Sequence, residues 1–94
     1  MSGRLRQKVL VIVGGTSGLG LSAARACVAE GAKVIVVGRD EAKAEAARKE
    51  LGPDALALTA DATDPKTALA AINLALGNFG AFHGLYHVAG GSGR

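Results

Sequence analysis

The stretch from Lys8 to Gly20, KVLVIVGGTSGLG, restricts the fold more than any other part of this sequence. An apolar, β-branched run over residues 9–13 is followed directly by a glycine-rich turn over 14–20 and then by a helical pattern over 21–30. A strand, a glycine turn and a helix in this order open a dinucleotide-binding unit, in which an anionic diphosphate lies against the free amides at the start of the helix.

Each glycine of this turn has a predicted role. Gly14 stands where the chain reverses and favours a positive φ, Gly18 lets the backbone approach a pyrophosphate, and Gly20 lets the helix lie tightly on the strand. Thr16 and Ser17 add hydroxyl donors. The spacing here is G-x-x-x-G-x-G rather than the G-x-G-x-x-G of the dinucleotide-binding fingerprint. The other phosphate-binding loop, G-x-x-x-x-G-K-[ST], is absent because no lysine follows the glycines. The alternative interpretation is a tight turn that binds no ligand.

Composition limits the remaining classes of protein. The chain has 94 residues, 49% of them hydrophobic and 3% aromatic, which predicts one domain with an aliphatic core. The net charge is +3, but the basic residues are scattered and no aromatic residues are interleaved with them, so nucleic acid is not a predicted partner. The single cysteine, Cys27, is predicted to be a core residue in a reducing compartment. We expect a cytoplasmic protein, with no secretory signal and no membrane segment.

Strand and helix patterns alternate along the whole chain. Strands are predicted over 8–13, 33–37, 55–59 and 82–88, and helices over 18–30, over 41–51, and from Pro65 to an end marked by Gly77 and Gly80. Connections of helical length require parallel strands and right-handed crossovers. The predicted fold is therefore α/β, a doubly wound, Rossmann-like parallel sheet of four strands in the order 3-2-1-4, with helices on both faces.

The helices carry predicted caps and apolar faces. Asp40 and Asp64 are the expected N-caps of the second and third helices. Apolar residues at helical spacing predict the buried faces. These residues are Leu19, Ala23, Ala26 and Cys27 in the first helix, and Leu69, Ile72, Leu76 and Phe79 in the third.

Four landmarks give the chain a family resemblance over about residues 8–91. Residues 13–20 match the motif T-G-x-x-x-G-x-G, with Val13 in place of the threonine, and Gly31-Ala32-Lys33-Val34 matches the entry to the second strand. Asp61 matches the acid that follows the third strand and contacts adenine. After the fourth strand, His87-Val88-Ala89-Gly90 matches the last two positions of the motif N-N-A-G. The chain resembles the N-terminal, cofactor-binding half of a short-chain dehydrogenase/reductase. In that family a hydride passes between a nicotinamide dinucleotide and a carbonyl or alcohol.

Motif and resemblance together assign the contacts to this cofactor. The residues are Gly14, Thr16, Ser17, Gly18, Leu19, Gly20, Arg39, Asp61, Ala62, Ala89 and Gly90. The family's acidic position at the end of the second strand falls on Gly38, and Arg39 follows it, which favours NADP over NAD because an arginine pairs with a 2′-phosphate. The alternatives are Asp40 as the ribose acid and Arg39 as a solvated surface charge.

No catalytic residue is predicted. The family uses a tyrosine with a lysine four residues later, beside a serine, whereas Tyr86 is followed four residues later by Gly90 and lies within a predicted strand, where packing explains it. His83 and His87 lie on the same strand, about 13 Å apart, too far to share a metal ion. Whether the chain is an enzyme stays open, and a non-catalytic nucleotide-binding or partner-docking module, or a remnant that binds nothing, is the alternative.

The family continues beyond the fourth strand with further strands and helices. We therefore expect this chain to be a fragment of a larger Rossmann domain. The strand over 82–88 would be an open edge that carries Leu85 and Val88. We expect it to associate either with a second copy or with the missing C-terminal half.

Overall fold

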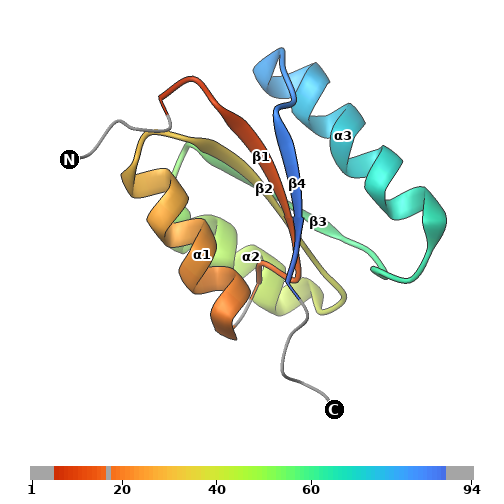
Figure 1. The fold of residues 1–94 in the computed structure, drawn as a ribbon. Helices are drawn as coiled ribbons and strands as arrows, with labels where there is room; N and C mark the ends of the chain where they lie inside the picture. Colours follow the sequence, from red (N-terminus) through yellow and green to blue (C-terminus); the bar gives the residue numbers. More distant parts are fainter. Residues whose placement is uncertain (1–5, 17, 89–94) are drawn as a thin grey trace.

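Three crossovers of helical length place four parallel strands in the order β3-β2-β1-β4 in the computed structural model, which describes residues 6–16 and 18–88 (Figure 1). The strands are β1 (Val9–Val13), β2 (Lys33–Gly38), β3 (Ala55–Thr59) and β4 (Gly84–His87), and the helices are α1 (Gly18–Ala29), α2 (Glu41–Leu51) and α3 (Pro65–Phe79). The predicted fold class and strand order are confirmed. The fourth strand is shorter than the predicted 82–88.

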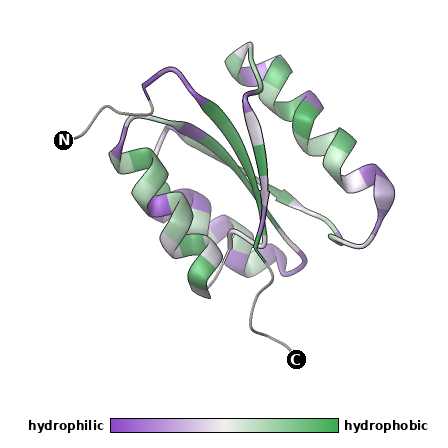
Figure 2. Cartoon of the chain, in the orientation of Figure 1, coloured by the Kyte–Doolittle hydropathy of each residue, from purple (hydrophilic) through white to green (hydrophobic). Residues whose placement is uncertain are grey.

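The sheet is buried on both faces, which explains why β1 and β2 lack an alternating polar pattern. Val9, Val11 and Val13 pack with Ala71 and Ala75 of α3 on one face. On the other face, Leu10 and Ile12 belong to a core shared with α1 and α2, which also holds Ala24, Ala47 and Leu51. Figure 1 shows α1 and α2 together on one side of the sheet and α3 on the other. Hydrophobic colouring follows the central strands in Figure 2.

The predicted helix caps are confirmed. A carboxylate oxygen of Asp40 accepts a hydrogen bond from Lys43 N at 3.1 Å, and one of Asp64 accepts from Lys66 N at 2.9 Å. Gly80, in the left-handed conformation, ends α3. Gly77 lies inside α3 and does not end it. A glycine costs a helix only about 1 kcal/mol, which the surrounding packing offsets here.

The predicted face of α1 was wrong. The buried residues of α1 are Gly20 and Ala24, with Cys27 packed beside them, whereas Leu19 is 75% exposed and Ala23 and Ala26 are also exposed. Because α1 lies close to the sheet, the line of contact selects small residues, and the larger ones lie beside it.

The same error occurs in α3. Thr67, Ala71 and Ala75 are buried, while Leu69 is 62% and Leu76 49% exposed. Phe79, from the predicted face, does pack against the core. In both helices the residues chosen from spacing lie beside the contact line, which is formed by Gly20 and Ala24 in α1 and by Thr67, Ala71 and Ala75 in α3.

Strand β4 forms one edge of the sheet, as predicted. His83 extends its pairing by one residue, because its backbone N donates to Val9 O at 2.8 Å and its ring Nδ1 accepts from Val9 N at 2.9 Å. Leu85 is 39% and Tyr86 57% exposed, so the expectation that packing explains Tyr86 was wrong. An edge strand lacks the second neighbour and the covering helices that would bury this side chain.

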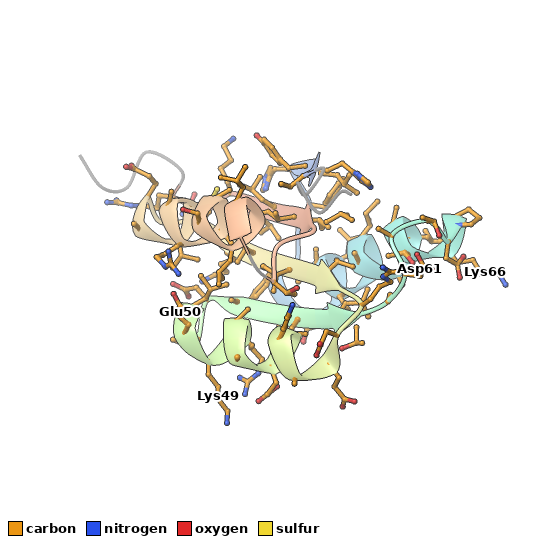
Figure 3. All side chains as sticks on the ribbon, turned by 90° about the horizontal axis from the view of Figure 1, so that it is seen from below. Lys49, Glu50, Asp61 and Lys66 are labelled. Carbon is orange, nitrogen blue, oxygen red and sulfur yellow. The ribbon has the colours of Figure 1, made fainter. Side chains whose placement is uncertain are left out.

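Polar contacts tie the helices together at the surface. Arg25 of α1 pairs with Glu50 of α2, and Figure 3 shows Glu50 on the side of α2 nearer α1, whereas Lys49 points away. Such exposed pairs contribute at most about 1 kcal/mol each. Within the described residues, no helix is both long enough and apolar enough to cross a membrane.

Candidate functional site

The carboxyl ends of all four strands meet at one edge of the sheet. Beyond β4, Val88 N donates to Val13 O at 2.9 Å, and beyond β3, Ala60 N donates to Gly38 O at 2.9 Å. These bonds carry the pairing past the last strand residues, so the turn after β1 lies between the ends of β2 and β4. Sheets of this type bind ligands at this edge, where the strand order reverses between β1 and β4.

The turn after β1 is fixed by backbone contacts on two sides. Gly14 N and Gly15 N both donate to Val37 O of β2, at 2.8 and 3.2 Å. Gly14 has a φ of +90°, and a Cβ built on it would lie 2.7 Å from Val88 O beyond β4. Both features confirm the predicted role of Gly14, and they show that the turn has no room for a side chain there.

Gly20 brings the first turn of α1 against this backbone. A Cβ at Gly20 would overlap the carbonyl oxygen of Gly14 and lie 3.0 Å from Gly15 Cα. The predicted close approach is confirmed, although the immediate partner is the turn itself. Gly18 differs, because it has a φ of +58° and, among the described residues outside its own helical turn and chain neighbours, no atom lies within 4 Å of its Cβ position. The backbone at Gly18 is therefore open to a ligand.

Helix α1 begins at this open point. The first amides of a helix have no partner within it and carry a partial positive charge, which suits an anion. The first turn of α1 has no acidic residue, whereas α2 carries Glu41 at the equivalent place. No carboxylate in the first turn of α1 therefore competes with an anion at this helix start.

The ends of β2 and β3 supply polar groups beside the turn. Thr16 is 9% exposed and lies against Gly38, while Arg39 is exposed next to it. Hydrogen bonds from the Thr63 hydroxyl and backbone N–H lower the pKa of Asp61, and the positive charge of Arg39 lowers it further. Arg39 and Asp61 are thus close enough to interact. Figure 3 shows Asp61 at the far end of the molecule from Glu50.

The structure describes eight of the predicted cofactor residues, which lie after the carboxyl ends of β1, β2 and β3. They are Gly14, Thr16, Gly18, Leu19 and Gly20 in the turn and first helical turn, and Arg39, Asp61 and Ala62 at the ends of β2 and β3. Ser17, Ala89 and Gly90 lie outside the described residues.

Sequence reasoning missed Gly15. Its Cβ position is 2.9 Å from both Ile12 O and Val36 Cγ1, so it too has no room for a side chain. The pair Gly14-Gly15 was the available signal, but the motif leaves position 15 unspecified.

Candidates for other chemistry are not supported. Burial raises the pKa of the Cys27 thiol, which packs against the core, in line with the predicted core role of this residue. Among the described residues, no three His, Cys, Asp or Glu side chains come together as metal ligands.

The fold and the glycine turn define a Rossmann-type domain of the kind that binds dinucleotides. Residues 8–94 match the family described as short chain dehydrogenase, and the chain belongs to this family. It is 41% identical over 90 residues to the 3-alpha-(or 20-beta)-hydroxysteroid dehydrogenase of Mycobacterium tuberculosis. This alignment covers 96% of this chain and 35% of that protein. It is 40% identical over 72 residues to the human 3-hydroxyacyl-CoA dehydrogenase type-2, covering 77% and 28% of the two chains.

Solved structures agree with this assignment. A 3-ketoacyl-(acyl-carrier-protein) reductase from Brucella melitensis, complexed with NADH, superposes with a TM-score of 0.81 at 41% identity, over 86% of this chain and 33% of the other. A short chain dehydrogenase from Bacillus anthracis gives a TM-score of 0.82 at 30% identity, over 90% and 35%. The chain spans about a third of the length of these relatives.

Proposed function

We propose that this chain is the NADP(H)-binding portion of an oxidoreductase that transfers a hydride between the nicotinamide and a carbonyl or alcohol. The observation that carries the proposal is the contact of Gly20 with the Gly14 carbonyl, which seats the start of α1 against the turn and leaves Gly18 open. A diphosphate placed there would meet backbone amides and the positive end of a helix, with no Cβ in the way.

The neighbouring residues fit the rest of the nucleotide. Thr16 in the turn after β1 lies against Gly38, and Arg39 follows β2, so in this proposal they face the adenosine ribose and its 2′ substituent. Asp61 accepts both bonds from Thr63 on Oδ1, at 2.8 and 2.7 Å, which leaves Oδ2 for a donor on the adenine. The bound nucleotide would supply the hydride chemistry, and the residues of this chain would hold and orient it.

The choice of NADP follows from charge. Gly38 offers no carboxylate to the 2′-hydroxyl of NAD, and Arg39 is an exposed cation beside that position. A guanidinium pairs with a phosphate through two parallel hydrogen bonds, which favours the 2′-phosphate of NADP.

Titration of NADPH and NADH fluorescence against the purified chain tests this assignment. We expect Arg39→Asp to weaken NADPH binding by more than about ten-fold and to spare NADH. Lys49→Asp is the matched control, because it makes the same charge change on a side chain of α2 that points away from the rest of the domain (Figure 3). The control should leave both affinities unchanged. Equal loss of both nucleotides in Arg39→Asp would refute the assignment.

A non-catalytic nucleotide-binding module is the second candidate. Both candidates are compatible with the absence of a Tyr-x-x-x-Lys motif from residues 1–94. The two candidates share the nucleotide site, so the sequence encoded after Arg94 separates them. A Tyr-x-x-x-Lys motif there would support the oxidoreductase, and a stop codon would support the module.

A further inference from the structure

Thr16 and Gly38 compete for one small volume at the end of β2. A Cβ built on Gly38 would lie 3.0 Å from Thr16 Cβ and 2.8 Å from its Cγ2, and it would overlap Oγ1. The contacts with Oγ1 and Cγ2 are shorter than Cβ atoms in proteins show, and the contact with Thr16 Cβ is at the lower limit. With Thr16 in place, residue 38 therefore has no room for any side chain.

Thr16 cannot turn away to relieve this contact. It is β-branched, so a rotation about χ1 can turn only one of Oγ1 and Cγ2 away from Gly38, and it leaves the Thr16 Cβ in place. Its backbone is held as well, because the preceding residues Gly14 and Gly15 donate to Val37 O, the residue before Gly38. The turn and the end of β2 are thus linked on both sides of the contact.

We infer that Thr16 is a specificity-determining residue for the nucleotide, an inference that rests on the proposed function. Its side chain fills the place from which a carboxylate at position 38 would reach the 2′-hydroxyl of NAD. Selectivity then depends on a pair of positions, with Thr16 excluding the acid and Arg39 attracting the 2′-phosphate. An acid introduced at position 38 alone will displace the turn and will not create an NAD site.

Thermal unfolding tests the contact without any nucleotide. We expect Gly38→Ala to lower the melting temperature of the chain by at least about 4 °C, as overpacked sites do. In a Thr16→Gly background the same change should leave the melting temperature unchanged or raise it, because the methyl then enters a vacated space. An equal effect of Gly38→Ala in both backgrounds would overturn the inference.

Fluorescence titration with NADPH and NADH then tests specificity. We expect Gly38→Asp to weaken both nucleotides. The double variant Thr16→Gly with Gly38→Asp should bind NADH at least about ten-fold more tightly than Gly38→Asp alone, without recovering NADPH binding. If Gly38→Asp alone gains NADH affinity and keeps the original melting temperature, Thr16 is not the determinant.

The unsubstituted chain separates this inference from the proposed function. If it binds neither nucleotide at millimolar concentration, the proposed function fails and the specificity claim fails with it. If it binds NADPH but the two backgrounds respond alike, the proposed function stands and only the role of Thr16 is overturned.

Discussion

Replacing Gly20 with alanine adds a single methyl group at the most crowded point of the glycine turn. The added Cβ would overlap the Gly14 carbonyl oxygen and lie 2.6 Å from the Gly14 carbonyl carbon. These are backbone atoms, so no side chain can rotate away. The turn can move only by weakening the hydrogen bonds from Gly14 N and Gly15 N to Val37 O.

The change in stability caused by Gly20→Ala combines one stabilising contribution with two destabilising ones. Alanine in place of glycine stabilises a helix by about 0.5–1 kcal/mol. Overpacking costs about 1–3 kcal/mol, and one weakened backbone hydrogen bond costs about 1 kcal/mol more. We expect Gly20→Ala to destabilise the chain by about 2 kcal/mol, which lowers the melting temperature by about 8–16 °C in a domain of this size.

Gly77→Ala is the matched control for this experiment. Gly77 also lies within a helix, but no atom from the described residues outside its own helical turn and chain neighbours comes within 4 Å of its Cβ position. Only the helix propensity changes there, so we expect the melting temperature to rise by about 2–8 °C. Thermal unfolding followed by circular dichroism measures both variants. Equal behaviour of Gly20→Ala and Gly77→Ala would refute the close approach of α1 to the turn.

Two further predictions concern the surface of the domain. The pKa of Asp61 is lowered by its bonds from Thr63, so its stabilising effect is complete above the ordinary carboxyl value of about 4 and is lost as the pH falls through the folded value. The melting temperatures of the chain and of Asp61→Asn should therefore converge as the pH falls below about 4, and a constant difference would contradict this. Tyr86 is exposed on the edge strand β4, where we expect copies of the chain to associate, so Tyr86→Lys should reduce self-association in sedimentation velocity. Association at the same strength in Tyr86→Lys would contradict this prediction.

Local sequence signals predicted the strands, caps and turn because each depends on nearby residues. Asp40 and Asp64 bond to amides two or three positions later, and the positive φ of Gly14 is a property of its own backbone. The continuous apolar runs of β1 and β2 likewise predicted burial on both faces. Strand order then followed from connection length and handedness.

Other features depend on distances that the sequence does not contain. The buried faces of α1 and α3 are set by how closely each helix approaches the sheet, so Ala24 and Ala75 lie at the contact and Leu19 and Leu76 do not. The contact between Thr16 and Gly38 joins two separate segments and exists only because the turn is bonded to β2. The sequence shows that position 38 lacks the family's acidic residue, but it does not show that Thr16 occupies the space beside Gly38.

The central claim is that a diphosphate binds against the amides at the start of α1. It is tested most directly by following backbone amide resonances of the ¹⁵N-labelled chain during titration with NADPH. We predict the largest shifts at Gly14, Gly18, Gly20 and Arg39, with Gly52 and Gly77 unaffected. Shifts confined to other regions, or no shifts at millimolar nucleotide, would contradict the account.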